Sequence, residues 1–422
     1  MANIRIEAYG CSASFADSEI ISGLITNGGH TITQNPKDAD LNLIVTCSVK
    51  DATASKMIHR MKTLSSRPLV VAGCLSKAEP NTVQKLVPKA SLLGPNSLGS
   101  TLDVVNSALQ GRKKISLNHD HFSKVGIPKI RLNPIVGIVE IASGCMSECT
   151  FCQTKLAKEE LQSYRMGDIV RQIKQDITDG CKEIWLTSTD NGCYGLDINT
   201  TLPELIQNIT EIPGDYKIRV GMMNPMYMAK ISDELLKAYD DSHIYKFLHI
   251  PVQSGSDKVL HGMKRGHTRN TFENIVKKFR SKFTDMTIST DIIVGFPTEG
   301  REYLQDTITL LKNTKPEIVN LSKFSNRPGT FANDLTQLDS QEIKRRSKQI
   351  TEIINKISED CNRKWLNRVE DVQFVEESTE GVRGRNFAYK SIYVKKGAKL
   401  GKQHRVKITK CTRHALYGNI VC

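Results

Sequence analysis

The chain has 422 residues, of which 39% are hydrophobic, and a formal net charge of +14 at pH 7. This length predicts roughly two to three domains, each able to bury its own core. The sequence has neither a signal-peptide pattern at MANIRIEAYG nor an apolar run of the ~18 residues that a membrane helix needs, so it argues against a secreted or membrane protein and predicts a cytoplasmic one. In a reducing compartment, eleven cysteines are more typical of metal ligands or free core residues than of disulfides.

The first part of the chain places one cysteine after each of three strand-like runs. Cys11 follows IRIEAYG, Cys47 follows LNLIVT and Cys74 follows PLVVAG. Parallel strands end at one edge of their sheet, so a small parallel α/β domain would gather these three thiols. An isolated cysteine after a strand is more often a core residue, but three at equivalent strand ends favour a shared metal-cluster site.

A second group of cysteines lies in GCMSECTFC, where Cys145, Cys149 and Cys152 have the spacing CxxxCxxC. Three thiolates on one short loop can hold three irons of a [4Fe–4S] cluster and leave the fourth iron open to a substrate or cofactor. A zinc site completed by a distant fourth ligand, or a set of buried thiols, is the alternative interpretation.

The middle of the chain alternates between strand-like and helix-like segments about six times. The strand-like runs are IVGIVEIAS, EIWLTS, KIRVGM, KFLHIPV, TISTDIIVGF and IVNLSKF. This alternation predicts a parallel sheet with helices outside it, as an open sheet or as a full or partial barrel. Chemistry in such folds gathers beyond the C-terminal ends of the strands, and the CxxxCxxC loop follows the first strand at that end.

The C-terminal part of the chain is strongly basic. An amphipathic helix, SQEIKRRSKQITEIINKISEDCNRKW, is expected to lead into it, and from Arg383 onward the chain has eleven Lys or Arg and no Asp or Glu. FAYKSIYVK and HRVKITK alternate like strands and predict a small β-barrel. Its cations, with Phe387, Tyr389 and Tyr393 among them, favour an RNA surface over a merely solvated face. The candidate RNA-binding residues are Arg383, Arg385, Lys395, Lys396, Lys402 and Arg405.

An ordered set of motifs over nearly the whole chain resembles the radical S-adenosylmethionine (AdoMet) methylthiotransferases. The matching motifs are YGCSASFADSE, VTCSVK, VAGCLSK, GCMSECTFC, LTSTDNGCYGLD, RVGMMNP, HIPVQSGSDKVL, TDIIVGFPTE and FSNRPGT. TKLAKEELQSY, LTSTDNGCYG and RVGMMNP are most similar to the archaeal and eukaryotic branch, often called MtaB. Two departures from that branch are Lys158-Glu159-Glu160, where a glycine usually follows a basic residue, and Thr189, where Glu or Gln is common.

The resemblance implies an α/β fold in three parts. These are a small parallel α/β domain over residues 1–115, a partial (β/α)6 radical-AdoMet barrel with its connector helix over 130–362, and a TRAM-like basic β-barrel over 363–422. It also implies two [4Fe–4S] clusters and AdoMet as cofactors. Cys145, Cys149 and Cys152 would hold the cluster that cleaves AdoMet, and Cys11, Cys47 and Cys74 the auxiliary cluster that carries sulfur.

Several polar residues at strand ends match family motifs that face the cavity. The expected AdoMet contacts are Asp190, Gln253, Ser254 and Asp291, with Asp190 also a catalytic candidate. Arg219 on the third strand is a candidate for the AdoMet carboxylate. Capping groups are the alternative for the first four residues, and a structural ion pair is the alternative for the arginine.

The implied reaction inserts a methylthio group at C2 of N6-threonylcarbamoyladenosine at position 37 of tRNA. One AdoMet would methylate the sulfur and a second would generate a radical, with a low-potential electron donor and a sulfur donor as further partners. The alternatives are another modified tRNA adenosine, a ribosomal-protein side chain, a non-catalytic iron–sulfur RNA-binding protein, and a zinc-binding RNA module.

Overall fold

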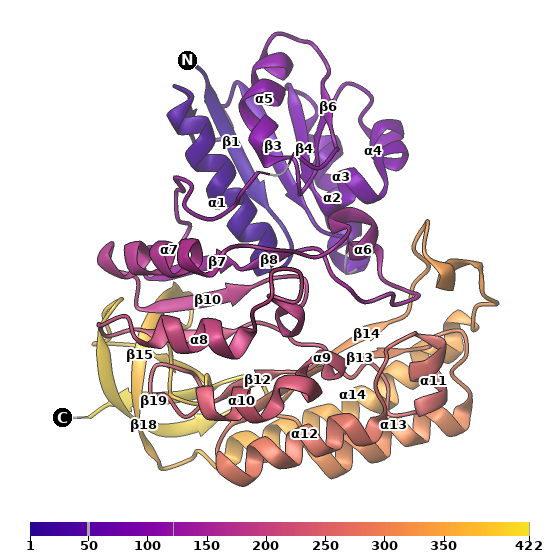
Figure 1. The fold of residues 1–422 in the computed structure, drawn as a ribbon, viewed down its shortest axis with the longest axis vertical. Coiled ribbons are helices and arrows are strands. Elements are labelled where there is room, and N and C mark those ends of the chain that lie inside the picture. Colours follow the sequence, from indigo (N-terminus) through magenta and orange to yellow (C-terminus); the bar gives the residue numbers. More distant parts are fainter. Residues whose placement is uncertain (49–50, 121, 422) are drawn as a thin grey trace.

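Three regions built on β-sheets follow one another along the chain in the computed structural model (Figure 1): an N-terminal sheet, a central region and a C-terminal barrel. It describes residues 1–48, 51–120 and 122–421, with only the backbone of 51–55, so the last two residues of the VTCSVK motif lie outside the described part. No helix of the described residues has the length and apolar character needed to cross a lipid bilayer.

The N-terminal sheet has six parallel strands in the order β2-β1-β3-β4-β5-β6. Its strands are β1 (Asn3–Ala8), β2 (Thr31–Ile32), β3 (Leu41–Thr46), β4 (Leu69–Gly73), β5 (Ser91–Leu93) and β6 (Ile115–Ser116). Its helices are α1 (Ser12–Asn27), α2 (Asp51–Leu64), α3 (Cys74–Ala78), α4 (Pro80–Leu86) and α5 (Thr101–Leu109). Every residue of β3 and β4 is buried, as expected for central strands covered on both faces. The predicted parallel α/β domain is therefore confirmed, with β2, β5 and β6 as short additional strands.

The central region contains all six predicted strands. They are β7 (Val136–Glu140), β10 (Glu183–Thr187), β11 (Lys217–Val220), β12 (Phe247–His249), β13 (Thr287–Val294) and β14 (Ile318–Lys323). The surrounding helices are α6 (Gln153–Lys158), α7 (Met166–Thr178), α8 (Leu202–Thr210), α9 (Pro225–Met228), α10 (Ser232–Ala238), α11 (Asp257–Gly262), α12 (Arg269–Lys282) and α13 (Arg301–Thr314). A hairpin of β8 (Ala142–Ser143) and β9 (Gln162–Ser163) follows β7.

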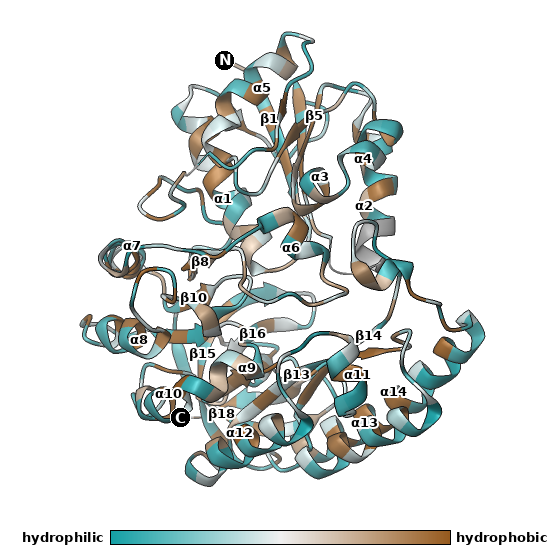
Figure 2. Cartoon of the chain, turned by 45° about the vertical axis from the view of Figure 1, so that its right-hand side comes forward, coloured by the Kyte–Doolittle hydropathy of each residue, from teal (hydrophilic) through white to brown (hydrophobic). Residues whose placement is uncertain are grey.

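The six central strands hydrogen-bond as two parallel three-stranded sheets, β11-β10-β7 and β12-β13-β14. A single bridge between Ile218 and Ile244 joins the two halves in the described residues. β12 has only three residues and ends two residues before Pro251, whose ring removes a backbone donor and so limits the length of the ladder. The large hydrophobic core spans both sheets and their helices, and Figure 2 shows hydrophobic residues along the strands with hydrophilic ones on the outer turns of α12 and α13.

The C-terminal region is a closed five-stranded barrel, as the sequence predicts. Helix α14 (Ser340–Arg363) leads into β15 (Val369–Ser378), β16 (Gly381–Arg385), β17 (Ser391–Val394), β18 (Gln403–Cys411) and β19 (Leu416–Ile420). The predicted strand FAYKSIYVK begins only at Ser391. The four residues before Ser391 form a turn between β16 and β17. Tyr389 in this turn has φ 60°, a left-handed conformation that is incompatible with an extended strand.

Candidate active site

The three N-terminal cysteines lie at one edge of their sheet. Cys11 precedes α1, Cys47 follows β3 and Cys74 begins α3. Burial raises the pKa of the Cys74 thiol, Lys158 opposes that rise, and the negative charge of Cys11 and Cys47 adds to it. The three thiols are therefore close enough to act on one another electrostatically, as the strand-end argument predicts.

The backbone packs tightly around these thiols. A Cβ on Gly10 would lie 2.7 Å from the Cβ of Cys47, and Gly10 has φ +130°. A Cβ on Gly73, which has φ +90°, would lie 2.5 Å from the carbonyl oxygen of Thr46. The glycine before Cys11 and the one before Cys74 are thus required for the close approach of the three cysteine loops.

The second cysteine group is held by hydrogen bonds from three directions. The Cys145 amide donates to the carbonyl oxygen of Glu159 at 3.3 Å, and the Ser147 amide donates to the Cys145 sulfur at 3.3 Å. Arg265 donates through Nη1 to the Cys149 sulfur at 3.2 Å and through Nη2 to the Pro251 carbonyl oxygen at 2.8 Å. A buried cation therefore already faces one sulfur of this group.

The thiols of this group also act on one another. Burial raises the pKa of Cys152 to about 11, and the negative charge of Cys149 and Cys145 contributes to that rise. Cys145, Cys149 and Cys152 therefore converge, as their spacing predicts.

Cys193 is a buried residue that belongs to neither of the two cysteine groups. It lies in the 3-10 turn η2 (Asn191–Cys193), and its sulfur, the Cys145 sulfur and an Asp190 carboxylate oxygen all lie within 4.8 Å of one another. The Cys193 thiol donates to the Asp190 carbonyl oxygen at 3.1 Å, and its proximity to Cys145 lowers the pKa of Cys145, although burial opposes this. The available sequence signal was a thiol three residues after a polar strand-end residue.

Asp190 organises the loop after β10. Its Oδ1 accepts from the amide of Gly192 at 2.9 Å and from that of Asn224 at 3.0 Å, which ties together the loops after β10 and β11. Asn224 in turn donates to Ser147 Oγ at 3.2 Å in the cysteine loop. Burial, together with the charge of nearby Cys145, raises the pKa of Asp190 to about 7.

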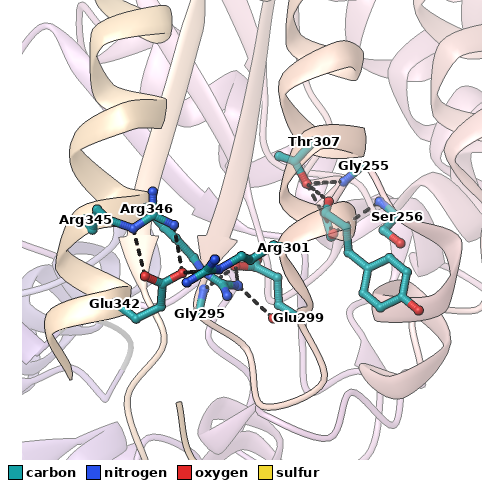
Figure 3. Close-up of polar contacts among 11 residues, drawn as sticks. Gly255, Ser256, Gly295, Glu299, Arg301, Thr307, Glu342, Arg345 and Arg346 are labelled. Carbon is teal, nitrogen blue, oxygen red and sulfur yellow. Dashed lines mark hydrogen bonds and ion pairs between the residues drawn. The ribbon is translucent and has the colours of Figure 1, made fainter. Parts of the chain in front are cut away.

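The loop after β12 is pinned to α13 (Figure 3). The Gly255 amide donates to Thr307 Oγ1 at 2.9 Å, and the Ser256 amide donates to Ser254 Oγ at 3.2 Å. Gln253, next to these residues, has φ 72°, a strained backbone conformation for a non-glycine residue. Ser254 thus has a clear role in the turn, while Gln253 is held in a conformation that its neighbours impose.

The two remaining strand candidates lie inside the central sheets. Asp291 on β13 accepts hydrogen bonds from Asn320 at 2.7 Å and is 3.1 Å from His249 Nε2. The Arg219 guanidinium lies over the rings of Trp185 and Phe247, each at 5.4 Å. The contacts described for Arg219 thus join it to aromatic rings and not to the cysteine loops.

The N-terminal cysteine edge faces the central cysteine loop. Ser12, directly after Cys11, hydrogen-bonds through Oγ to Thr187 Oγ1 at 2.7 Å at the end of β10. Helix α3, which begins at Cys74, packs against α6, which begins just after Cys152. Figure 1 shows α6 at the border between the N-terminal and central regions. The two cysteine groups therefore approach each other across the interface between the N-terminal and central regions, which we call the seam.

A buried ion network crosses this seam. The Lys124 ammonium lies 2.6 Å from Asp17 Oδ1 on α1 and 3.0 Å from Glu140 Oε2 on β7. Lys158 lies 2.5 Å from the other oxygen of Glu140. Burial would raise the pKa of Glu140, but the two lysines override it and the pKa is lowered. The network fixes α6, and with it the last central cysteine, against the N-terminal sheet.

Comparisons with known proteins agree on two regions of the chain. Residues 139–311 match the model of the radical SAM superfamily, and residues 3–94 match that of the uncharacterized protein family UPF0004. Among solved structures, the fold is similar to that of the radical S-adenosylmethionine methyltransferase TsrM from Kitasatospora setae, with a TM-score of 0.57, 12% identity, and coverage of 79% of this chain and 77% of that one.

Curated relatives match over nearly the whole of this chain. A probable threonylcarbamoyladenosine tRNA methylthiotransferase of Pyrococcus horikoshii is 38% identical over 427 residues, covering 100% of both chains. The human threonylcarbamoyladenosine tRNA methylthiotransferase is 34% identical, covering 99% of this chain and 74% of its own. This chain belongs to the threonylcarbamoyladenosine tRNA methylthiotransferase family. The predicted family and branch are thereby confirmed.

Radical SAM enzymes use a [4Fe–4S] cluster and AdoMet, and the central cysteine loop of this methylthiotransferase fits them. The thiol of Cys145 has a lowered pKa, which favours the thiolate form that iron requires. Buried polar atoms around the loop lack a hydrogen-bond partner in the described structure: Ser188 Oγ, Thr189 Oγ1, Asn191 Oδ1 and Gln253 Oε1. Unpaired buried polar atoms are costly, so these four mark groups that a polar ligand such as AdoMet would satisfy.

The methylthiotransferase departs from its branch at Glu159, and the structure shows the local consequence. Glu159 has φ 61° and ψ −141°, a backbone region that is essentially restricted to glycine. A Cβ on Gly144, just before Cys145, would lie 1.8 Å from the Glu160 carbonyl oxygen, so the two segments cross in close contact. The usual family glycine therefore corresponds to a real conformational requirement.

The six predicted RNA-binding residues of the barrel fall into two groups. Lys395, Lys396, Lys402 and Arg405 are exposed. Arg383 pairs with Glu376, and Arg385 lies 4.4 Å above the Tyr389 ring at the boundary with the central sheets. The exposed group is therefore available to a polyanion, whereas the other two already make structural contacts.

Proposed function

We propose that this enzyme inserts a methylthio group at C2 of N6-threonylcarbamoyladenosine at position 37 of tRNA. The observation that carries the proposal is the approach of two cysteine groups across one seam, joined by the Ser12–Thr187 hydrogen bond and by the packing of α3 on α6. The names of relatives from archaea, fly and human, each matched over at least 99% of this chain, support the same substrate.

The proposed reaction replaces the C2 hydrogen of adenine by a methylthio group. A reduced [4Fe–4S] cluster with AdoMet supplies a radical that can remove hydrogen from this unactivated C–H bond. Cys145, Cys149 and Cys152 would hold that cluster, and Cys11, Cys47 and Cys74 would hold the auxiliary cluster. Asp190 ties together the loops after β10 and β11 through its two amide contacts, and Arg265 keeps a positive charge against Cys149.

The partners and the domain limits complete the proposal. A low-potential electron donor and a sulfur donor are needed for turnover, and the cytoplasm would provide tRNA and both donors. The three parts would be residues 1–115, 130–362 and 363–422, supported by separate hydrophobic clusters in the N-terminal sheet, the central sheets and the C-terminal barrel. Lys395, Lys396, Lys402 and Arg405 would attract tRNA phosphates from the exposed barrel surface.

An anaerobic assay tests the proposal. The cluster-reconstituted protein is incubated with AdoMet, a low-potential reductant and tRNA bearing N6-threonylcarbamoyladenosine, and the digested nucleosides are examined by mass spectrometry. We expect the 2-methylthio nucleoside together with 5′-deoxyadenosine. Cleavage of AdoMet with an unchanged nucleoside would retain the radical chemistry and reject this substrate.

A further inference from the structure

A cavity of about 250 Å³ lies where the central sheets, α14 and the C-terminal barrel meet. The central sheets contribute Arg219, Phe247 and Glu317 to its wall, and the barrel contributes Arg385 and Lys390. Arg413 and His414, both exposed, also line it and connect it to solvent. None of the six cysteines in the two cysteine groups lines this cavity, so the cavity is separate from the site described above.

Three cations in the wall have only neutral partners among the described contacts. Arg219 lies over aromatic rings, and Arg385 lies over the Tyr389 ring and hydrogen-bonds to Ser391. The buried Lys390 ammonium donates to the amide oxygen of Asn362 at 3.1 Å. Tyr389 lies close to both guanidinium groups, because the Arg219 guanidinium also lies 5.8 Å from the centre of the Tyr389 ring.

The carboxylates that act on these cations already serve other donors. Glu317 accepts from Arg280 through both oxygens at 2.9 Å and from the Ile288 amide at 2.7 Å. Glu183, which acts electrostatically on Arg385, accepts from Trp185 and from Tyr245. The wall is therefore positively charged overall, and the Nε of Arg385 is buried without a hydrogen-bond partner. Buried cations and unpaired donors are costly unless an anion completes them.

We propose that this cavity binds a phosphate group between Arg219, Arg385 and Lys390. Guanidinium groups match the oxygen geometry of phosphate in a bidentate manner, and an ammonium adds a third donor. The cavity is several times larger than the ~30 Å³ share of one water molecule, so it accommodates the anion with an attached group or retained waters. The phosphate is either free inorganic phosphate or a backbone phosphate of the RNA substrate, and the second source rests on the proposed function.

Equilibrium dialysis of the full-length protein with radiolabelled inorganic phosphate, against chloride at the same ionic strength, tests the site directly. We expect saturable binding that weakens at least tenfold in Arg385→Gln and in Lys390→Gln. Binding should be unchanged in Lys174→Gln, which removes an exposed lysine of α7. Arg385→Lys keeps the charge and is expected to retain part of the binding, which separates loss of the anion from loss of folding. Thermal melting of each variant checks that it is folded.

The RNA source is tested by measuring tRNA affinity as a function of salt concentration. If a backbone phosphate enters the cavity, Arg385→Gln lowers the slope of log K against log salt by roughly 0.7–0.9, and inorganic phosphate competes with tRNA. Retained phosphate with an unchanged tRNA slope assigns the site to free phosphate. Absence of saturable phosphate binding together with an unchanged slope overturns the proposal. The dialysis uses neither AdoMet nor modified tRNA, so its outcome is independent of the proposed reaction.

Discussion

Glu159 is a residue whose backbone contradicts its side-chain type. Its φ and ψ values lie in a region of backbone conformation that is essentially restricted to glycine. Its carbonyl oxygen nevertheless accepts a hydrogen bond from the Cys145 amide, and its carboxylate lies 2.9 Å from the Lys77 ammonium. The surrounding loop crossing holds it there, so strain is stored beside a cluster-type cysteine.

Glu159→Gly is expected to stabilise the protein by about 1 kcal/mol, because relief of backbone strain exceeds the extra entropy of glycine in the unfolded chain. The lost ion pair with Lys77 is partly exposed and contributes little. The thermal midpoint of the cluster-free protein measures the effect. Glu160→Gly is the control, since Glu160 has no positive φ, and an equal gain in that variant would contradict the strain argument.

Glu19 on α1 predicts a pH dependence of stability. Burial raises its pKa to about 7, while its Oε1 accepts from the Leu132 amide at 3.0 Å. A carboxyl group with a raised folded pKa contributes stability that is full below its unfolded pKa of about 4.5 and is lost as the pH rises through about 7.

Glu19→Gln keeps the neutral form at every pH. We therefore expect it to match the original protein near pH 4.5 and to be more stable by about 3 kcal/mol at pH 8. Urea unfolding at the two pH values measures this difference, with the exposed Glu211→Gln as the matched control. A gain of the same size at both pH values would show that Glu19 is not protonated in the folded protein near neutral pH.

At the scale of elements, loops after parallel strands bring the two cysteine groups together. The loops after β1, β3 and β4 carry one group, and the loop after β7 and β8 carries the other. Each set of strands presents its C-terminal ends to the seam, which the Ser12–Thr187 contact and the α3–α6 packing close. The two groups therefore have separable roles although they are neighbours.

Substitutions in the two groups should have different effects. Cys145→Ala is expected to abolish 5′-deoxyadenosine formation, whereas Cys74→Ala should leave part of it and abolish the methylthio product. Both products are measured in one anaerobic incubation, with iron and sulfide content determined for each variant. Cys361→Ala, a buried cysteine on α14, is the control for loss of a core thiol. Full methylthio product from Cys74→Ala would remove the auxiliary-cluster role.

The sequence predicted these elements well because their patterns are local. Buried apolar runs marked all six central strands, and the period of apolar residues marked α14. It did not predict the position of Cys193 beside Cys145, because that contact depends on how the loop after β10 folds back. The sequence also offered Arg219 as a candidate for binding AdoMet. It could not reveal that aromatic rings from other strands and from the barrel lie against the Arg219 guanidinium, because those residues are distant along the chain.

At the scale of the whole molecule, the ion network around Lys124 joins the N-terminal and central parts. Lys124→Met would leave Asp17 and Glu140 buried with less compensation and is expected to destabilise the protein by about 3–5 kcal/mol. The unfolding free energy measures the loss, and Lys113→Met on the exposed surface is the control. Adding Asp17→Asn to Lys124→Met should recover part of the stability. A double variant no more stable than Lys124→Met would contradict the charge explanation.

The wall shared by the barrel and the central sheets is the other whole-molecule feature. Tyr389 from the barrel packs with Tyr245 and Phe247 in one small hydrophobic cluster, and the Lys246 amide donates to the Phe387 carbonyl oxygen at 2.7 Å. Removing the chain from Arg383 onward would leave β15 with only Gly381 and Val382 of β16 and would expose this cluster, so RNA binding is better tested by point substitutions. Because residues of the barrel and of the central sheets pack in one cluster, the two regions must change together in evolution. A chimera that carries the barrel of a distant relative would therefore also need the matching aromatic residues of that relative's central strands.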